Sequence, residues 1–271
     1  MSLTDAELSH RIAQEAGALL LKLRTSFGDV SDRARADALR AEGDRQSHDL
    51  ISARLAEHRP GDAVLSEEGK DDPARLDAER VWIVDPLDGT WEYGQGRSDF
   101  AVHIALWRPG GGRPQACTVD LPAQGLTRSM LDDVSGSPAA FPLPDDRPIR
   151  IVASRTRPPA SLAAACDIVA ERLAETGVNA HGVEIVDVGS VGAKVNELLG
   201  GRAEAYVHDT GFYEWDVAAP YGVAWHYGFP CMHLDGSAVD FNRMPPYVTD
   251  LVVAHPSLMD MLRAAVAEAS R

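Results

Sequence analysis

The stretch Asp85-Pro86-Leu87-Asp88-Gly89-Thr90 lies directly behind the apolar run Arg80-Val81-Trp82-Ile83-Val84. Because this run is short and rich in β-branched and aromatic residues, it is typical of a buried strand. Asp85 then stands at the strand tip, where Pro86 stiffens the turn and Asp88 can swing back toward the carboxylate of Asp85. The pattern predicts a strand that ends in two converging oxygen donors, as a metal site requires.

The end of the same stretch is suited to an anion. Gly89 lets the backbone approach a ligand closely, and Thr90 supplies a hydroxyl where a helical turn with free N–H groups can begin. Asp-Pro and Asp-Gly are also common turn formers, so a plain turn is the alternative for either dipeptide alone. The whole string favours a phosphate bridged by Mg²⁺ ions.

Composition limits the partners of the chain. Its 271 residues, 45% hydrophobic and 25% charged, correspond to about two average domains or one bilobal unit. The net charge of −15 argues against nucleic acid or an anionic membrane, because both need clustered Lys and Arg. No apolar run has the length of a membrane span, and Met1 to Glu7 lacks the pattern of a signal peptide. The odd, widely spaced Cys117, Cys166 and Cys231 are expected as reduced core residues of a cytoplasmic protein.

The first half of the chain predicts two helices followed by an antiparallel meander. Thr4-Asp5-Ala6-Glu7 has the capping-box form and opens an amphipathic helix that ends at Phe27-Gly28. A polar segment from Asp29 to Gly43 precedes a second helix predicted from about Asp44 to His58. A short strand from Ala63 then runs into two glutamates and a glycine. Further β-rich runs cover residues 100–107, 115–121 and 126–131.

The segment from Asp132 to Pro148 is rich in Asp, Pro, Ser and Gly, which predicts a boundary between a first domain over residues 1–147 and a second over 148–271. Beyond it, strands and helices alternate as in a three-layer α/β lobe. Strands are predicted at 149–153, 184–188, 203–208 and near Cys231 and Leu251. Helices are predicted at about 159–176, 191–199, 216–227 and from Ser257 onward. The pattern alone supports a mixed α and β fold.

Two further motifs accompany the central string, Ser66-Glu67-Glu68 just upstream and Trp215-Asp216-Val217-Ala218-Ala219 late in the chain. Together the three resemble the inositol monophosphatase-like family of Mg²⁺-dependent, lithium-sensitive phosphatases. Alone, the glutamates would be typical of a solvated loop, and Asp216 of a helix N-cap. The resemblance extends over essentially the whole chain. It implies the layered α-β-α-β-α sandwich of inositol monophosphatase and fructose-1,6-bisphosphatase, in which the second domain closes the active site.

The resemblance also implies a set of metal ligands, namely the carboxylates of Glu67, Asp85, Asp88 and Asp216 and the carbonyl of Leu87. These hard oxygen donors favour Mg²⁺ or Mn²⁺ over zinc. By the family pattern one ion is held by Glu67, Asp85 and Leu87 and a second by Asp85, Asp88 and Asp216, with two or three ions in all. Such ions activate a water for in-line displacement, without a phosphoenzyme.

Asp44 is the candidate partner of Thr90 in catalysis. The family usually has Thr-x-Ala-Asp where this chain has Ala41-Glu42-Gly43-Asp44, so the Asp is kept and the Thr is missing. The resemblance implies that Asp44 hydrogen-bonds Thr90 and that the pair orients the attacking water. From the residues alone, Asp44 is equally suited to capping the predicted second helix.

Four small motifs are similar to nucleotidases that act on 3′-phosphoadenosine 5′-phosphate. They are Glu92-Tyr93, Ser154-Arg155-Thr156, Gly189-Ser190 with Lys194, and Glu214-Trp215-Asp216. The similarity implies substrate contacts from Gly89, Thr90, Glu92, Arg155, Gly189, Ser190, Lys194 and Asp216.

The second anionic group of a bisphosphate needs cations away from the metals. Arg155 and Lys194 are the candidates, and each would otherwise be an ordinary surface charge. Phe212, Tyr213 and Trp215 are suited either to flanking a nucleobase or to packing in the core.

We therefore predict a Mg²⁺-dependent phosphomonoesterase of the 3′(2′),5′-bisphosphate nucleotidase type that converts 3′-phosphoadenosine 5′-phosphate to AMP and phosphate. The family resemblance implies a homodimer. Hydrolysis of an inositol phosphate or of fructose 1,6-bisphosphate at the same site is the alternative within the enzyme class. A non-catalytic metal- or nucleotide-sensing protein is the alternative outside it, and the complete set of carboxylates argues against it.

Overall fold

The computed structural model describes residues 3–28 and 32–271. The helices are α1 (Asp5–Phe27), α2 (Arg33–His58), α3 (Thr90–Gly94), α4 (Leu162–Glu175), α5 (Val191–Leu199), α6 (Glu214–His226) and α7 (Met259–Ala269). The strands are β1 (Ala63–Ser66), β2 (Val81–Asp88), β3 (Ala101–Trp107), β4 (Gln115–Leu121), β5 (Leu126–Ser129), β6 (Ile149–Ser154), β7 (Val183–Val188), β8 (Ala205–His208), β9 (Phe212–Tyr213), β10 (Cys231–Met232), β11 (Tyr247–Val248) and β12 (Leu251–Ala254). Single 3₁₀ turns lie at η1 (Pro73–Asp77), η2 (Pro122–Gln124) and η3 (Pro138–Ala140).

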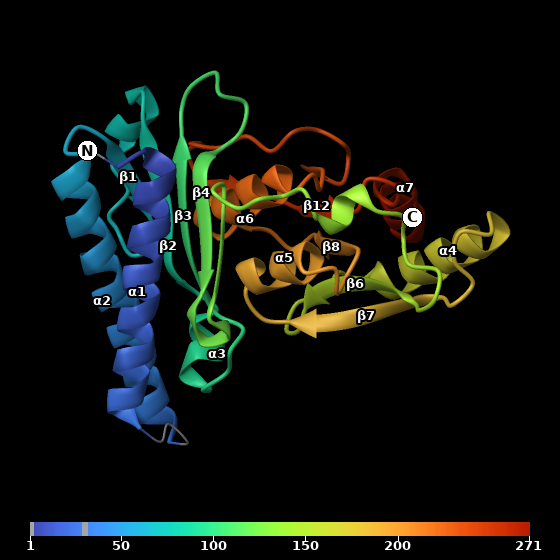
Figure 1. Ribbon diagram of the computed structural model, residues 1–271, viewed down its shortest axis with the longest axis horizontal. Helices are drawn as coiled ribbons and strands as arrows, with labels where there is room; N and C mark the ends of the chain where they lie inside the picture. The colour runs from blue at the N-terminus through green and yellow to red at the C-terminus, as the bar shows by residue number, and fades with distance from the viewer. Residues whose placement is uncertain (1–2, 29–31) are drawn as a thin grey trace.

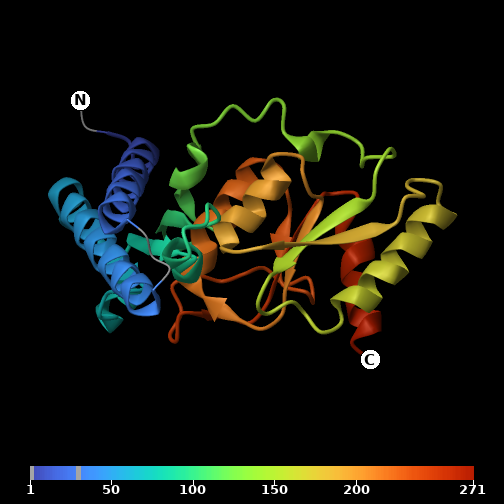
Figure 2. The same ribbon diagram turned by 90° about the horizontal axis from the view of Figure 1, so that it is seen from below.

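Helical and sheet layers alternate along the long axis of the molecule (Figure 1). Helices α1 and α2 cover the outer face of the first sheet, α5 and α6 lie between the two sheets, and α4 and α7 cover the outer face of the second. Figure 2 shows the same order of layers from below. The expected α-β-α-β-α sandwich is confirmed.

Helix α1 begins where the sequence predicts. The hydroxyl of Thr4 accepts the N–H of Glu7 at 3.2 Å, and the carboxylate of Glu7 accepts the N–H of Thr4 at 2.8 Å, which closes the capping box. Leu8, Ile12 and Leu20 on its inner face are buried in one core with Trp82 and Val102 of the first sheet. Apolar spacing in the sequence thus decides which face of α1 is covered.

Helix α2 begins at Arg33, so the prediction of a helix start near Asp44 is wrong. The cap is Asp32, whose carboxylate accepts the N–H of Arg35 at 3.3 Å. Residues 33–43 are mostly alanines and charged residues, held by charged pairs one turn apart such as Arg40 with Asp37, and Leu39 is the one large apolar side chain among them. Large apolar residues at helical spacing therefore do not mark residues 33–43 as part of the helix. Residues 29–31, where the predicted polar segment starts, lie outside the described residues.

The first sheet has the order β1-β2-β3-β4-β5, with β1 parallel to β2 and the other pairs antiparallel, which confirms the meander. In β2, Asp85 pairs with His103 and Asp88 pairs with Ala101, so β2 carries one extra residue between these pairs. Strand residues three apart normally point to opposite faces. The extra residue is a β-bulge, and it brings Asp85 and Asp88 to the same face.

The second sheet has the order β10-β12-β8-β6-β7, in which β6 runs parallel to β7 and β8 while β12 runs antiparallel to β8. The predicted strands and helices of this half are present. The small sheet of β9 and β11 was not predicted, because two-residue strands carry no readable alternation. The apolar core between the two sheets includes Val119, Tyr206 and Val217.

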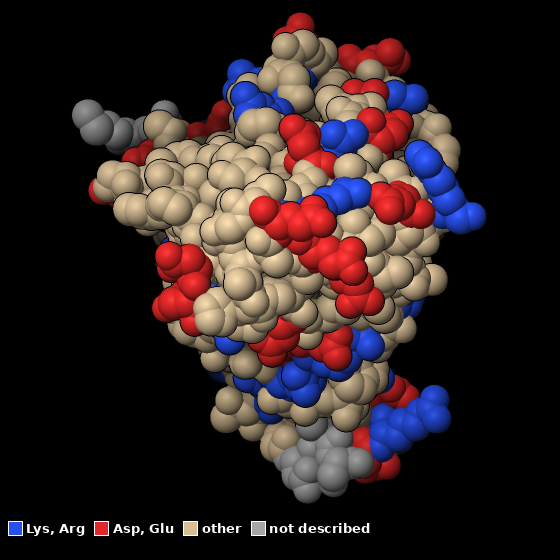
Figure 3. Space-filling view, turned by 90° about the vertical axis from the view of Figure 1, so that its right-hand side faces the viewer, with Lys and Arg blue, Asp and Glu red and all other residues tan. Residues whose placement is uncertain are grey.

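Cys117, Cys166 and Cys231 are all buried free thiols, as expected for core residues. Across residues 3–28 and 32–271, no helix combines the length and the apolar composition that a membrane crossing needs. On the face drawn in Figure 3, acidic and basic side chains are interspersed over the surface. Met1 and Ser2, which open the stretch tested for a signal peptide, lie outside the described residues.

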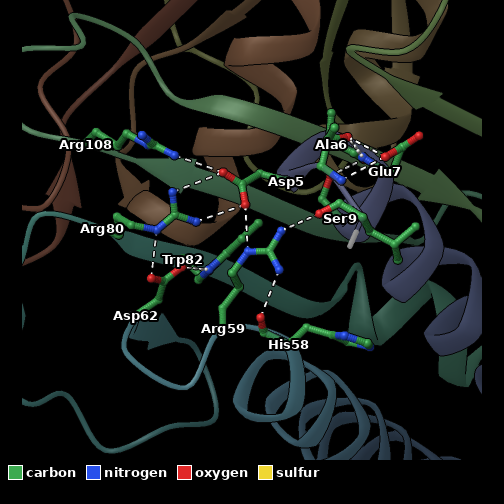
Figure 4. A network of polar contacts seen from close by, with 12 residues as sticks. Asp5, Ala6, Glu7, Ser9, His58, Arg59, Asp62, Arg80, Trp82 and Arg108 are labelled. Atoms are coloured by element: carbon green, nitrogen blue, oxygen red, sulfur yellow. Dashed lines mark hydrogen bonds and ion pairs between the residues drawn. The ribbon is translucent and has the colours of Figure 1, made fainter. Parts of the chain in front are cut away.

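A network of ion pairs fastens the start of α1 to the first sheet (Figure 4). The Asp5 carboxylate lies 2.8 Å from Arg59 at the end of α2, 2.9 Å from Arg80 before β2 and 2.9 Å from Arg108 after β3. Arg80 also pairs with Asp62 at 2.7 Å, and Asp62 accepts the indole N–H of the buried Trp82 at 2.7 Å. One carboxylate thus connects three segments that are distant in sequence.

We expect Asp5→Asn to lower the free energy of unfolding by about 1–2 kcal/mol at pH 7. Partial burial alone would raise the pKa of Asp5, but hydrogen bonds from Arg80 and Arg59 outweigh it and lower the pKa to about 2. The stabilisation is therefore complete above the unfolded pKa of about 4 and is lost as the pH falls toward about 2. Urea unfolding between pH 7 and pH 3 should show the deficit of the variant shrinking as the pH falls.

Asp37→Asn is the matched control, because Asp37 pairs with Arg40 on an exposed face of α2. Its cost should stay within about 0.5 kcal/mol. Equal costs for the two variants would mean that the network around Asp5 adds nothing to stability.

Candidate functional site

A cavity of about 290 Å³ opens between the two sheets. The ends of β2, β6 and β8 and the first turns of α3, α5 and α6 border it, an arrangement in which ligands commonly bind. Its lining residues are Glu67, Asp85, Leu87, Asp88, Gly89, Thr90, Trp91, Glu92, Ser154, Arg155, Thr156, Arg157, Gly189, Ser190, Val191, Lys194, Tyr206, His208, Phe212 and Asp216. Every residue predicted to bind metal or substrate lines this cavity, and only the catalytic candidate Asp44 lies behind it.

Asp85 is the most enclosed carboxylate of the cavity, with 1% of its surface exposed. Its Oδ1 accepts the N–H of Leu87 at 3.0 Å, while Oδ2 is buried without a hydrogen-bond partner among the described residues. Burial, together with the nearby Glu67 and Asp88, raises the pKa of Asp85 well above its usual range. An enclosed carboxylate oxygen without a partner fits a site for a bound cation.

Asp216 reaches the cavity from the third residue of α6. The helix is capped at Tyr213, and Asp216 accepts the N–H of Tyr213 at 2.8 Å, so the hypothesis that Asp216 is the N-cap is wrong. Burial raises the pKa of Asp216 to about 8, and Asp88 adds to the effect. Glu67, in the turn after β1, is partly open to solvent, but desolvation of its carboxylate raises its pKa to about 7. Both halves of the chain thus contribute carboxylates to the same cavity.

The residues present fit a hard divalent cation. The four predicted carboxylates all line the cavity, and Asp85 has an oxygen without a hydrogen-bond partner among the described residues. Ligand atoms of Asp85, Asp88 and His103 lie within 4.8 Å of one another, a spacing that a single ion can bridge. Oxygen donors of this kind match Mg²⁺ or Mn²⁺. His103, which no sequence motif marked, is the polar residue on β3 opposite Asp85.

Asp44 lies in the middle of α2, so the alternative that it caps this helix is wrong. Its Oδ1 is 3.5 Å from the hydroxyl of Thr90, whose nearer acceptor is the Leu87 carbonyl at 3.1 Å. One turn further along α2, the buried hydroxyl of Ser47 donates to the carbonyl of Pro86 at 2.7 Å. Helix α2 therefore supports the loop after β2 from behind, although the family Thr before Asp44 is missing. Asp44 and Ser47 are three residues apart, so they lie on the same face of a helix. A helix predicted from Arg33 would therefore have indicated that both side chains face the same neighbouring segment.

Basic and aromatic residues also line the cavity. Lys194 on α5 is buried, donates to the carbonyl of Gly189 and lies over the ring of Tyr206, so it is not an ordinary surface charge. Burial lowers the pKa of Lys194 to about 8. The rings of His208 and Phe212 stack at 4.2 Å, and both line the cavity. Of the three predicted aromatic candidates, Phe212 alone is a lining residue.

Arg155 is held by two carboxylates of the first half of the chain, at 2.9 Å from Glu92 and 2.7 Å from Asp99. The predicted substrate residues Glu92 and Arg155 therefore pair with each other across the two sheets. Arg157, which the sequence did not single out, also lines the cavity, and the described residues provide it with no ion pair. It stands two residues after Arg155 in the Ser-Arg-Thr-Arg string.

Glu214 has a supporting role beneath the site. It is fully buried and accepts the N–H groups of Asn242 and Arg243, each at 2.6 Å. The side chain of Asn242 in turn accepts a hydrogen bond at 2.6 Å from Arg75, which belongs to the segment that follows Glu67. These contacts tie the first turn of α6, which carries Asp216, to the segment after β1.

Residues 4–271 match the inositol monophosphatase family, and the chain belongs to this family of metal-dependent phosphatases. It is therefore an enzyme, and the alternative of a non-catalytic sensor is set aside. The layered fold agrees with solved structures. It is similar to CysQ from Bacteroides thetaiotaomicron, a bacterial member of the family, with a TM-score of 0.69 and 26% identity over 92% of this chain and 96% of that one. Inositol monophosphatase II from Staphylococcus aureus, at 21% identity, covers 94% and 92% of the two chains with a TM-score of 0.68 and shows the same fold.

Curated relatives are more similar in sequence. A protein of Mycobacterium bovis named 3′-phosphoadenosine 5′-phosphate phosphatase is 42% identical over 95% of this chain and 91% of its own length. A protein of Mycobacterium leprae with the same name is 41% identical over 98% and 94%. These matches span both halves of the chain, and the cavity lies between those halves.

We expect Glu214→Gln to lower the free energy of unfolding by about 1–3 kcal/mol, because one of two buried N–H groups would face an amide nitrogen that cannot accept its hydrogen bond. Urea unfolding of the substrate-free protein measures the loss. Glu197→Gln is the control, since Glu197 pairs with Arg202 at the surface, and its cost should be within about 0.5 kcal/mol. If the two variants are equally stable, the contacts of Glu214 do not hold α6 in place.

Proposed function

We propose that this protein hydrolyses the 3′-phosphate of 3′-phosphoadenosine 5′-phosphate, releasing AMP and phosphate, with Mg²⁺ as the cofactor. The observation that carries the proposal is that one cavity brings together four carboxylates and the basic side chains of Lys194 and Arg157. A bisphosphate needs both kinds of group, because the reacting phosphate requires metal ions and the second phosphate requires cations of the protein. The names of the relatives with 41–42% identity support the same substrate.

The Mg²⁺ ions would be held by Glu67, Asp85, Asp88, Asp216 and the carbonyl of Leu87. When bound, the ions supply Lewis-acid stabilisation of the phosphoryl oxygens and lower the pKa of the attacking water. The β-bulge in β2 aims Asp85 and Asp88 to the same side, and α6 brings Asp216 to them from the other half of the chain. The protein thus fixes the ligands before the substrate arrives.

We assign Thr90 and Asp44 to the attacking water. The Thr90 hydroxyl points toward the Leu87 carbonyl and the Asp44 carboxylate, and Thr90 lines the cavity while Asp44 does not. Thr90 can therefore accept a proton from water in the cavity while it donates its own to Asp44. Burial raises the pKa of Asp44 to about 7, which suits a group that accepts a proton near neutral pH.

We assign the second phosphate to Lys194 and Arg157. Arg155 and Glu92 then shape the wall beside it, since their mutual ion pair joins the two sheets next to Gly189. A Cβ atom at Gly189 would lie 2.6 Å from the Glu92 side chain, so only glycine allows this close packing. Contacts of the substrate with Gly89, Ser190 and Arg155, a cytoplasmic location and a homodimer stay predictions.

We expect 3′-phosphoadenosine 5′-phosphate to be hydrolysed with a higher kcat/KM than inositol 1-phosphate or fructose 1,6-bisphosphate. Measuring phosphate release in the presence of Mg²⁺ compares the three substrates.

Arg157→Ala should lower kcat/KM for the bisphosphate about 10-fold or more and affect adenosine 3′-phosphate less, because that ester lacks the second phosphate. Arg113→Ala is the control, since Arg113 lies over Trp225 outside this cavity. A tenfold preference for the sugar bisphosphate would overturn the substrate assignment.

Mutations should distinguish the residues that bind the metal from the residues that activate the water. Asp88→Asn removes a charged ligand, so activity and Mg²⁺ affinity should fall together. Thr90→Ala leaves every carboxylate in place and should lower kcat about 10²-fold or more with Mg²⁺ affinity nearly unchanged. Asp44→Asn should behave like Thr90→Ala, and the double variant should be little worse than either.

Steady-state kinetics over a Mg²⁺ series distinguishes these cases. If the effects of Thr90→Ala and Asp44→Asn multiplied, the two residues would not act as one unit. If Thr90→Ala weakened Mg²⁺ binding as much as Asp88→Asn, Thr90 would belong to the metal site instead.

A further inference from the structure

Trp91 is an exposed aromatic residue among those that line the cavity. It is the second residue of α3, and 48% of its surface is exposed, although tryptophan is highly buried on average in proteins. The residues that follow it in the helix, Glu92, Tyr93 and Gly94, are all buried. The short helix therefore packs its other end into the protein and leaves the indole of Trp91 open to solvent.

The other aromatic side chains of the cavity are enclosed. Tyr206, His208 and Phe212 line it, and they are 0%, 3% and 6% exposed. The rings of His208 and Phe212 stack on each other, and the ammonium group of Lys194 lies 5.4 Å from the ring centre of Tyr206. Among the described residues that line the cavity, Trp91 is therefore the aromatic residue whose ring is open to a ligand.

Contacts of the neighbouring residues hold α3 in place. The hydroxyl of Tyr93 donates to the carbonyl of Leu20 in α1 at 2.8 Å. Glu92 pairs with Arg155 of the second sheet at 2.9 Å. The backbone that carries Trp91 is thus fixed before a ligand arrives, and such preorganisation lowers the entropic cost of binding.

The position of Trp91 suits the base of a nucleoside 3′-phosphate. Trp91 follows Thr90 directly, and consecutive Cα atoms are about 3.8 Å apart, so its side chain starts beside the residue assigned to the attacking water. In the substrate, the carbon that bears the reacting phosphate and the carbon that bears the base belong to the same ribose ring. The base therefore lies close to the reacting phosphate, where a flat indole next to Thr90 can cover one of its faces.

We propose that Trp91 is a specificity-determining residue, whose indole stacks on the nucleobase of the bisphosphate. The proposal rests on the proposed function, because only a nucleotide substrate carries a base. Stacking on an aromatic side chain is tolerant of base identity, since every base has a flat π face. Inositol and fructose phosphates have no such face. Trp91 thus favours nucleotides as a class over phosphates of sugars and polyols.

An abasic analogue of 3′-phosphoadenosine 5′-phosphate, with hydrogen in place of adenine, separates stacking on the base from support of the catalytic loop. Trp91→Leu should lower kcat/KM for the nucleotide about 10-fold or more and leave kcat/KM for the abasic analogue within about twofold of wild type. Trp91→Phe keeps a flat ring and should lose no more than about threefold on the nucleotide. Phosphate release measures the hydrolysis of both compounds.

Phe141→Leu is the control, because Phe141 is also exposed but is not a residue of this cavity. It should leave kcat/KM unchanged for both compounds. An equal loss on the nucleotide and the abasic analogue in Trp91→Leu would overturn the proposal, since Trp91 would then support Thr90 and not the base. So would a wild-type protein that hydrolyses the abasic analogue as efficiently as the nucleotide.

Failure of the proposed function has a different signature. Calorimetry compares the binding of AMP, the proposed product, with that of ribose 5-phosphate, and it requires no hydrolysis. If 3′-phosphoadenosine 5′-phosphate is not hydrolysed but AMP binds about 10-fold tighter than ribose 5-phosphate and Trp91→Leu removes the difference, the reaction assignment fails and the role of Trp91 stands. If the wild-type protein binds the two compounds equally, the role of Trp91 fails whichever ester is hydrolysed.

Discussion

The mutual crowding of carboxylates is the constraint on which this structure depends. Asp85, Asp88, Glu67 and Asp216 line one cavity, and desolvation raises the pKa of Asp85, Asp216 and Glu67. Such an arrangement opposes folding unless a cation is bound, because each charge is both desolvated and repelled by its neighbours. The surrounding helices and strands hold these carboxylates together despite the unfavourable free energy of desolvation and repulsion. The cluster is thus explained by ligand binding and not by stability.

Three supports fix the cluster, and each comes from a different layer. The β-bulge in β2 sets the directions of Asp85 and Asp88. Helix α2 holds the following loop from one side through Ser47 and Asp44. From the other side, the buried Glu214 locks the first turn of α6 to residues 242–243, and the N–H of Gly192 at the start of α5 binds Asp88. The carboxylate cluster therefore belongs to both halves of the chain and is complete only when they pack together.

The cavity also shows how an acidic protein can receive an anionic substrate. The chain has a net charge of −15, and its long-range field repels phosphates. Attraction must then be local, and Lys194 and Arg157 are the basic side chains of the cavity that can supply it. Lys194 is nearly enclosed, so its charge acts at short range in a medium that screens it weakly.

The sequence by itself determined the antiparallel meander of the first half and the candidate metal and substrate residues that line the cavity, and the resemblance of its motifs to a family supplied the layered fold. The reason is that these depend on local composition and on motifs such as Asp85–Thr90, where turn chemistry and ligand chemistry coincide. The start of α2 was missed because charged pairs within residues 33–43, and not apolar spacing, mark that part of the helix.

Only the tertiary structure decided the partners of the buried polar groups. Arg155 and Glu92 each resembled a substrate contact in sequence, yet they pair with each other because β6 and α3 meet across the cavity. His103, Ser47 and Arg157 carry no motif, and their places follow from the bulge in β2, the length of α2 and the turn after β6. A one-dimensional pattern records which residues are polar, whereas the pairing of a buried charge depends on which distant segment supplies its partner.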